Sequence, residues 1–264
     1  MEELKISIVT VSLNQGKYIE DAIQSVLKQN YKNFEHIIID GFSTDNTVEI
    51  LKKYKHLDWI SERDEGQSDA LNKGFKKCTG DVIGWLNSDD WYHENTFNKV
   101  KNILLDNSID AVYGDYISVN ENNEEIQKHF VQKPSKIMSK FINFIPSTTL
   151  FFKKKIIDAN ILIDKNFHIC MDKEFIANLM HKNYRIKKIN KFLASFRFHE
   201  TNKSNRTLKI SKIMKKEGLI IYNRYSKIKL PNNIIGIFLY IAMGKLNQVY
   251  RFVCKKTRLG IFSE

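Results

Sequence analysis

Cysteine is scarce in this chain of 264 residues, and its three cysteines, Cys78, Cys170 and Cys254, lie far apart. This number and spacing argue against a disulfide framework and against a cysteine-based zinc site, and they suit a reducing compartment. Residues 1–5 are acidic and show no signal-peptide pattern. We therefore expect a cytoplasmic protein.

Several catalytic motifs are also missing. The seven histidines form no HxxxH or HxH pair, so a metal centre held by histidines is not expected. The chain has neither the glycine-rich loop of P-loop nucleotide hydrolases nor that of Rossmann dehydrogenases. It also lacks the nucleophile elbow of serine hydrolases. These absences count against kinases, nucleotide hydrolases, dehydrogenases and serine hydrolases.

Positive charge is concentrated at one end of the chain. Residues 205–264 hold 13 Lys and Arg against 2 Asp and Glu, a net charge of +11, whereas residues 1–204 hold 29 against 28. Basic residues alternate at helical spacing with apolar ones in 209–221, and the apolar run 234–243 is too short to span a bilayer. We expect a basic, mostly helical extension over 205–264.

The role of this extension stays open at the sequence level. It either lies on the anionic inner face of the cell membrane or packs as a helical hairpin on the rest of the chain. A nucleic-acid partner is not expected, because aromatic residues are sparse among the cations and residues 1–204 carry almost no excess charge.

Strand-like and helical patterns alternate through the first ninety residues. The predicted strands are residues 6–11, 34–39, 59–61 and 82–86, and the helices between them are 18–27, one after residue 47, and 68–77. Such alternation predicts an α/β fold with a parallel sheet and right-handed crossovers.

Polar residues follow each of these strands, at the edge where open α/β sheets bind ligands. They are Thr10 and Asn14, Asp40, Glu62 and Asp64, and then Asp89 and Asp90. Two adjacent carboxylates repel each other and require a cation or strong donors nearby. Their oxygens suit Mg²⁺ or Mn²⁺, although a turn that caps the next helix is the alternative.

The pattern loosens after residue 92. We expect helices at 97–104 and 172–181, and strands at 111–119, 126–131, 147–152, 184–189 and 192–198. The expected domain therefore covers residues 1–204, with a nucleotide half at about 1–91 and an acceptor half at about 92–204 in a mixed sheet.

Four ordered motifs, at residues 9–29, 37–47, 61–74 and 80–90, resemble those of family 2 glycosyltransferases, especially the subset that builds bacterial surface polysaccharides. The resemblance covers residues 6–91, is weaker over 92–204 and is absent beyond. It implies a GT-A (Rossmann-like) fold, with a mixed, mostly parallel sheet flanked by helices. It also implies transfer with inversion from a nucleotide-diphosphate sugar, most simply a UDP-sugar. The implied cofactor is Mn²⁺ or Mg²⁺, and the implied acceptor is lipid-linked or an oligosaccharide for capsule, O-antigen or a similar glycan.

The resemblance also implies roles for single residues. The residues implied to bind the donor nucleotide are Thr10, Ser12, Asn14, Asp40, Asp64, Asp69, Asn72, Lys73, Ser88 and Asp89, and the implied metal ligands are Asp89, Asp90 and His199. Two positions depart from the family pattern. Asn87 stands where many members have Asp, and Gly41 replaces a frequent second Asp. These departures leave a rival interpretation, a nucleotide-sugar-binding protein with impaired catalysis.

A single displacement also needs a carboxylate that accepts the proton of the acceptor hydroxyl. Asp172 is our candidate, because it resembles the base position of the family at a helix start. The alternatives are an N-cap role for Asp172 and catalysis by Glu174. Four further residues have open roles: His199 as a ligand or a structural histidine, Lys203 and Ser204 as phosphate clamps, and Asp115 as an acceptor-side or strand-edge residue.

Overall fold

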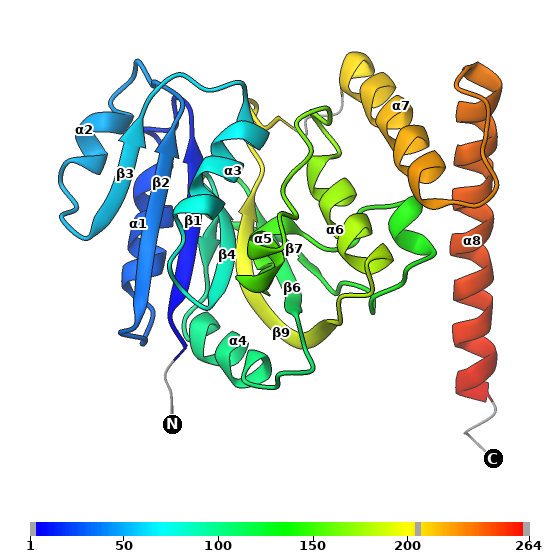
Figure 1. Ribbon diagram of the computed structural model, residues 1–264, viewed down its shortest axis with the longest axis horizontal. Coiled ribbons are helices and arrows are strands. Elements are labelled where there is room, and N and C mark those ends of the chain that lie inside the picture. The colour runs from blue at the N-terminus through cyan, green and yellow to red at the C-terminus, as the bar shows by residue number, and fades with distance from the viewer. Residues whose placement is uncertain (1–3, 204–206, 261–264) are drawn as a thin grey trace.

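The computed structural model describes residues 4–203 and 207–260, which fold around one twisted mixed sheet (Figure 1). Within these residues the sheet has nine strands in the order β3-β2-β1-β4-β8-β6-β9-β5, with β7 paired to β6. Their bounds are β1 Ile6–Ser12, β2 Phe34–Asp40, β3 Leu57–Ser61, β4 Val82–Asn87, β5 Trp91–Tyr92, β6 Ala111–Val119, β7 Glu125–His129, β8 Phe151–Lys153 and β9 Ile186–Arg197. The α/β class predicted from the alternation is confirmed.

The first half of the sheet is parallel. β1 pairs in parallel with β2 on one side and with β4 on the other, and β2 pairs with β3. The connecting helices are α1 Ile19–Leu27, α2 Thr47–Leu51 and α3 Gln67–Lys77. Every residue of β1 is buried, as expected of a β-branched run covered on both faces. The carboxyl ends of β1, β2 and β4 therefore meet at one edge.

The second half continues the same sheet with antiparallel pairs. β8 lies between β4 and β6 and is antiparallel to both. The helices here are α4 Thr96–Leu104, α5 Lys155–Asp158 and α6 Met171–His181, with 3₁₀ turns η1 Met138–Lys140 and η2 Ser147–Thr149.

Two element predictions in this half were wrong in detail. The segment 147–152 is not one strand, because Thr149 donates its hydroxyl to the carbonyls of Gly114 and Pro146 and holds a 3₁₀ turn before β8. The two strands predicted at 184–189 and 192–198 are one strand, β9, whose pairing with β6 shifts register near Asp115.

The basic segment after residue 206 forms two helices, α7 Leu208–Tyr225 and α8 Ile234–Gly260. In Figure 1, α7 lies between α6 and α8, and α8 forms the edge of the molecule opposite β3. Leu219, Ile221 and Tyr222 of α7 are almost fully buried. The helical-hairpin interpretation is therefore correct for the described residues. No helix among them is both long enough and apolar enough to cross a bilayer.

Aromatic side chains fill both faces of the sheet. Phe75, Trp85, Phe152 and Phe175 are buried on one face, in the cluster that also contains Ile221 of α7. Complete burial of one such side chain contributes about 1.5–3 kcal/mol. This packing fixes α6 and α7 on the same side of the sheet as α3.

Candidate active site

A cavity of about 480 Å³ opens at the carboxyl ends of β1 and β4. Its walls come from α3, the start of α6 and the residues that follow β9. The predicted site residues that line it are Ser12, Asp64, Ser88, Asp89, Asp172 and Lys203. This volume lies within the range of small-molecule sites in proteins. Loops from both halves of the sheet thus line one cavity.

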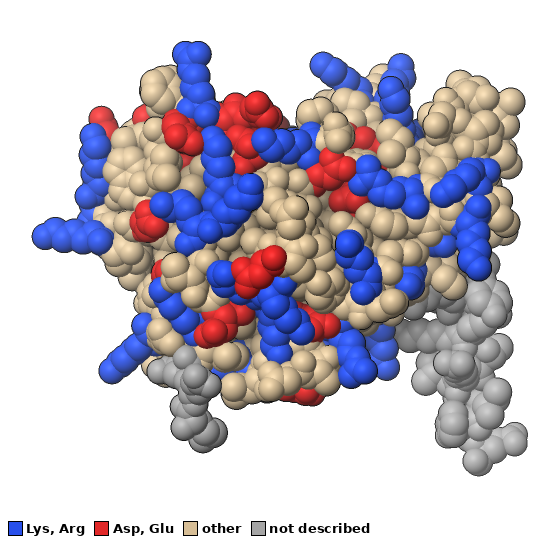
Figure 2. Space-filling model, in the orientation of Figure 1, with Lys and Arg blue, Asp and Glu red and all other residues tan. Residues whose placement is uncertain are grey.

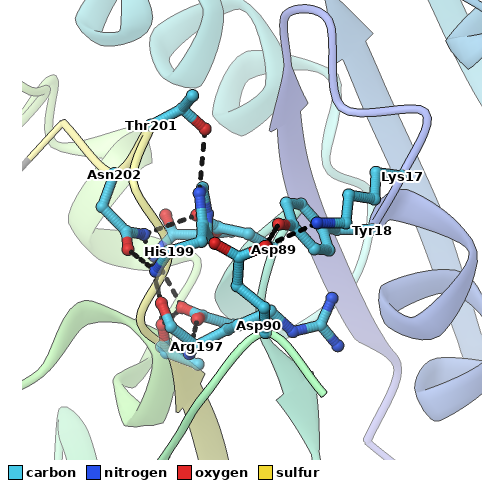
Figure 3. Close-up of polar contacts among 11 residues, drawn as sticks. Lys17, Tyr18, Asp89, Asp90, Arg197, His199, Thr201 and Asn202 are labelled. Atoms are coloured by element: carbon cyan, nitrogen blue, oxygen red, sulfur yellow. Dashed lines mark hydrogen bonds and ion pairs between the residues drawn. The ribbon is translucent and has the colours of Figure 1, made fainter. Parts of the chain in front are cut away.

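Asp89 and Asp90 occupy different environments. The Asp89 side chain is 18% exposed and lines the cavity. Its Oδ2 accepts hydrogen bonds from Nε2 of His199 at 3.0 Å and from Nδ2 of Asn202 at 3.1 Å. Its Oδ1 has no protein partner within the described residues. One oxygen of Asp89 is therefore available to a ligand in the cavity (Figure 3).

Asp90 lies beneath Asp89 and is fully buried. The backbone N–H of Arg197 donates to its Oδ1 at 3.0 Å, and the Thr148 hydroxyl donates to its Oδ2. Burial, reinforced by the neighbouring charge of Asp89, raises the pKa of Asp90 to about 8. Protein donors thus occupy both oxygens of Asp90, which does not line the cavity. Of the two kinds of metal contact that the resemblance implies, direct or through water, this arrangement favours the one through water.

Asn87 supports this carboxylate pair. Its Nδ2 donates to Oδ2 of Asp90 at 2.9 Å, and its Oδ1 accepts from the indole N–H of Trp85 at 3.1 Å. An Asp at this position would place a second carboxylate against Asp90. The amide therefore explains the first departure from the family pattern, since only the amide supplies a donor at this point.

His199 holds Asp89 in place. Its imidazole lies between the Asp89 carboxylate and the Thr201 hydroxyl, which is 2.8 Å from Nδ1. The ring of Tyr18 packs against it with centroids 4.6 Å apart (Figure 3). Because Nε2 donates to the Asp89 carboxylate, the Thr201 hydroxyl is placed to donate to Nδ1. The His199 side chain is 2% exposed and reaches the cavity through Asp89.

Below these residues Arg197 is buried between two aromatic rings. Its guanidinium lies 4.6 Å from the ring centroid of Tyr18 and 4.8 Å from that of Trp91, and it pairs with Asp21 at 2.5 Å. The contacts connect α1 to the end of β9, which fixes the strand that carries His199.

Asp172 lies in the first turn of α6 and faces the cavity. Asn143 donates to its Oδ2 at 2.6 Å, and the backbone N–H of Lys173 donates to its Oδ1 at 2.7 Å. Burial raises the pKa of this carboxyl above its usual value. A raised pKa makes the carboxylate a better proton acceptor, as general-base catalysis requires. The N-cap residue of α6 is Cys170, not Asp172, although the Asp172 carboxylate accepts one backbone N–H of the first turn.

Glu217 of α7 is a site residue that the sequence analysis missed. Its carboxylate accepts hydrogen bonds from the backbone N–H groups of His168, Ile169 and Cys170 at 2.7–3.1 Å. These residues directly precede α6, and His168 and Ile169 line the cavity. The one signal in the sequence was that Glu217 is the only acid among residues 205–263.

One side of the cavity, near the ends of β1 and β3, contains Ser12 and Asp64. Oδ1 of Asp64 accepts the backbone N–H of Gly66 at 2.7 Å, which shapes the turn before α3. Gly41 lies beside this carboxylate, and a Cβ at Gly41 would come 2.9 Å from Oδ2 of Asp64. The glycine therefore makes room for Asp64, which explains the second departure from the family pattern.

Six of the residues implied to bind the nucleotide do not line this cavity: Thr10, Asn14, Asp40, Asp69, Asn72 and Lys73. Thr10 is fully buried and pairs with Nε2 of His36 at 3.0 Å. Asp40 is fully buried and accepts from Ser43 and Ser61 at 2.5–2.9 Å. The side chains of Thr10 and Asp40 form hydrogen bonds with other residues of the protein and hold the loops in position.

The other four behave similarly. The amide of Asn72 exchanges two hydrogen bonds with the backbone of Ile163, at 2.8 and 2.9 Å. Asp69 pairs with Lys165 and, at 3.4 Å, with Lys73. The side-chain oxygen of Asn14 accepts the backbone N–H of Thr44 at 2.8 Å. These contacts position the cavity walls.

The residues with open roles are also placed. Lys203 lines the cavity and donates to Gln67 at 3.1 Å. Glu174 is buried and bonds to Arg224 and Tyr225, away from the cavity, so it is not a suitable base. Asp115 is buried and pairs with Lys188 at 3.0 Å. Ser204 lies outside the described residues.

The donor set for a cation at this site is small. Among the described residues, no group of three or more His, Cys, Asp or Glu is arranged to hold a metal ion. Mg²⁺ typically takes one or two protein carboxylates and completes its shell with water and substrate phosphates. The free oxygen of Asp89 fits that kind of site. Both ring nitrogens of His199 are hydrogen-bonded, to Asp89 and Thr201, so in this arrangement His199 orients Asp89, and its direct ligand role stays a prediction.

Comparison with known proteins gives a family match. The model of the family "Glycosyl transferase family 2" matches residues 7–165. The poly(ribitol-phosphate) beta-N-acetylglucosaminyltransferase TarP of Staphylococcus aureus strain N315 is 31% identical over 199 residues, 69% of this chain and 60% of that protein. The putative teichuronic acid biosynthesis glycosyltransferase TuaG of Bacillus subtilis strain 168 is 29% identical over 50% of this chain and 54% of that protein. The chain thus spans less than two thirds of the length of these curated relatives.

Solved structures share the fold. S. aureus TarS residues 1–349 in complex with UDP-GlcNAc match with a TM-score of 0.66 and 19% identity, over 94% of this chain and 73% of that one. The mannosyltransferase PcManGT of Pyrobaculum calidifontis, in complex with GDP-Man and Mn²⁺, also matches with a TM-score of 0.66, at 11% identity over 100% of this chain and 82% of that one. The similarity supports the predicted GT-A fold.

Proposed function

Because this chain belongs to glycosyl transferase family 2, we propose that it transfers a sugar from a nucleotide-diphosphate donor to an acceptor hydroxyl, with inversion at the anomeric carbon. The observation that carries this proposal is the cavity itself. It brings Asp89, with a free carboxylate oxygen, and Asp172, with a raised pKa, to the same enclosed space. In this proposal Asp89 holds the cation that a leaving diphosphate needs, and Asp172 accepts the proton of the attacking hydroxyl.

In this proposal Asp172 is the general base. The acceptor oxygen bonds to the anomeric carbon while the bond from that carbon to the diphosphate oxygen breaks, and the acceptor proton passes to Asp172. Asn143 and the backbone of Lys173 orient the carboxylate for this transfer. Such a base contributes roughly 10²–10⁴-fold to the rate.

Asp89 is the residue that we propose to hold Mn²⁺ or Mg²⁺, with His199 and Asn202 orienting its carboxylate. When bound, the metal would neutralise charge that develops on the diphosphate. Asp90 stays buried below and supports Asp89 through the loop. Ser12 and Asp64 line the donor side, and Lys203 offers a cation from the segment after β9.

The donor and acceptor are proposed from the relatives. TarS is crystallised with UDP-GlcNAc and TarP is named for N-acetylglucosaminyl transfer, so a UDP-sugar is the first donor to test. The names of TarP and TuaG refer to glycans of the bacterial surface, and we propose an acceptor of that class, lipid-linked or oligosaccharide. A cytoplasmic enzyme at the inner face of the membrane would suit a lipid-linked acceptor.

The rival interpretation, a binding protein with impaired catalysis, rested on Asn87 and Gly41. Both now have structural explanations that leave the cavity intact. They therefore no longer favour the rival.

Release of UDP from UDP-GlcNAc in the presence of Mn²⁺ tests the proposal, and a thermal-shift screen with UDP-, GDP-, CMP- and dTDP-sugars identifies the donor. A ligand at 100 times its Kd stabilises the folded state by about 2.7 kcal/mol. We expect Asp172→Asn to retain this shift and to lose transfer by at least about 100-fold. Asp158→Asn, in an exposed pair with Lys154, is the matched control. Unchanged transfer activity in Asp172→Asn would mean that another residue is the base. If the wild type turned over none of the donors, the proposed function would be wrong.

A further inference from the structure

Helix α8 is apolar on two opposite sides. One side packs against the body, where Tyr240 is buried and donates its hydroxyl to the Phe141 carbonyl at 2.7 Å. The opposite side carries large apolar residues at helical spacing, which we call the outer face: Ile234 (83% exposed), Ile235 (59%), Phe238 (71%), Leu239 (39%) and Leu246 (69%). A helix that is apolar all round is normally covered on all sides.

The inner side shows that α8 is firmly placed. Nζ of Lys173 donates to the Tyr240 hydroxyl at 2.7 Å and to the Phe141 carbonyl at 3.0 Å. Tyr240 also contacts Gly218 of α7, and Gly244 lies against Phe141. The orientation of α8 about its own axis is therefore fixed by these contacts, and the outer face is turned away from the body.

The surroundings of the outer face are basic. Lys227 and Lys229 are exposed on either side of Ile228, which is 72% exposed in the turn before α8, and Lys245 is exposed on α8 itself. The only acid in the described segment 207–247 is Glu217, which is buried against backbone N–H groups. Figure 2 shows the start of α8, at the upper right, as mostly uncharged surface with lysine and arginine side chains next to it.

We propose that the outer face of α8, with Ile228, is the surface by which this chain docks onto an anionic lipid bilayer. Helices of this kind lie in the plane of the membrane, with apolar side chains among the acyl chains and cations at the lipid phosphates. A second copy of the chain is a poorer occupant, because it would bring two segments of net charge +11 together. The proposal rests on the proposed function in one respect: a lipid-linked acceptor would lie in the same membrane.

Vesicle flotation of the full chain tests this surface. We expect the wild type to float with vesicles of phosphatidylglycerol and phosphatidylcholine at low salt, and less so with pure phosphatidylcholine or at high salt. The double variant Ile235→Ser, Phe238→Ser should bind the anionic vesicles at least about tenfold more weakly, because two apolar side chains are lost from the interface. A truncation that removes α7 is not a suitable test, since α7 contributes to the core.

The matched control is Ile126→Ser, Phe130→Ser, because these residues are 57% and 73% exposed at the β7 edge. Equal loss of vesicle binding in both variants would overturn the proposal. So would a wild type that fails to float with anionic vesicles, or that forms a dimer in sedimentation velocity which the α8 variant abolishes. UDP release in the absence of vesicles should be equal in all three proteins, and it reports on the proposed function separately.

Discussion

At the scale of single residues, the site depends on a division between two adjacent carboxylates. Asp89 faces the cavity with one free oxygen, whereas Asp90 is buried and accepts hydrogen bonds from Asn87, Thr148 and Arg197. Two neighbouring acids at one site cannot both ionise cheaply. Burial raises the pKa of Asp90, whereas Asp89 keeps one oxygen open to the cavity.

This division predicts opposite effects for two amide substitutions. Asp89→Asn should leave the melting temperature nearly unchanged and lower metal-dependent UDP release at least about 100-fold, which corresponds to about 2.7 kcal/mol. Asp90→Asn should destabilise the fold by about 1–3 kcal/mol, because its amide N–H₂ would face a buried donor. Thermal melts and donor turnover of both variants check this. Equal loss of stability in both would contradict the assignment.

Asp172 predicts a pH dependence. Burial raises its pKa above the usual range, and only the ionised carboxylate accepts a proton. Turnover should therefore rise with pH through this pKa, at a pH above the ordinary Asp value of about 3.9. The log of kcat/KM between pH 4 and 8 measures it, and the rise should be absent from the residual activity of Asp172→Asn. A wild-type profile that is flat down to pH 4 would argue against Asp172 as the base.

Several predicted site residues that line the cavity lie next to the ends of strands. Asp89, Ser12 and Asp64 reach the cavity because their strands end there. Asp40 also follows a strand, yet Ser43 and Ser61 surround its carboxylate. A polar residue at a strand end turns toward the cavity or into the protein interior, depending on which hydrogen-bond partners surround it. The spacing of residues in the sequence does not reveal these partners.

At the scale of elements, α6 carries the candidate base and α7 holds α6. Glu217 of α7 accepts hydrogen bonds from the backbone just before α6. Arg224 and Tyr225 of α7 donate hydrogen bonds to Glu174, which lies near the start of α6. Helix N-termini favour negative charge, so a buried carboxylate at this point satisfies N–H groups that would otherwise lack partners. The placement of Asp172 therefore depends on a helix more than thirty residues further along the chain.

We predict that Glu217→Gln lowers kcat between about 10- and 100-fold, because a small displacement of Asp172 misaligns proton transfer. The Kd for UDP, measured by thermal shift, should change little, since Glu217 binds the backbone of residues 168–170 and not Ser12 or Asp64. Glu49→Gln, an exposed substitution on α2, is the control. A loss of UDP affinity as large as the loss of kcat would mean that Glu217 supports the whole cavity and has no specific role at Asp172.

Helices and strands were predictable from the sequence where the local pattern of apolar residues determines the secondary structure. The four parallel strands and the helices between them follow from β-branched runs and helical periodicity in the sequence. β8 and η2 were not separable in the sequence, because the turn depends on a hydrogen bond from Thr149 to Gly114 of another strand. The same holds for β9, whose continuity comes from its pairing with β6.

At the scale of the whole molecule, charge predicts a boundary near residue 205, and the packing of α7 extends the core across that position. Residues 205–264 differ in composition from the rest, yet Ile221 lies in the same core cluster as Phe75 and Phe175. The charged residues of a segment determine the character of its solvent-exposed surface. They say little about whether its apolar face packs against the core. We therefore propose that α7 folds as part of the catalytic domain, whereas α8 is the more separable element.

Two truncations separate these elements. A chain that ends at residue 203 loses Leu219, Ile221 and Tyr222 from the interior, at about 1.5–3 kcal/mol each. The sum is comparable with the total stability of a typical domain, about 5–15 kcal/mol, so this chain should be insoluble or lack a cooperative melt. A chain that ends at residue 230 keeps α7, and it should fold with reduced stability, release UDP from the donor and fail to bind anionic vesicles. Soluble yield, thermal melting and flotation measure these outcomes. If the shorter chain melts at the same temperature as the full one, α7 is an appendage and the positioning role of Glu217 fails with it.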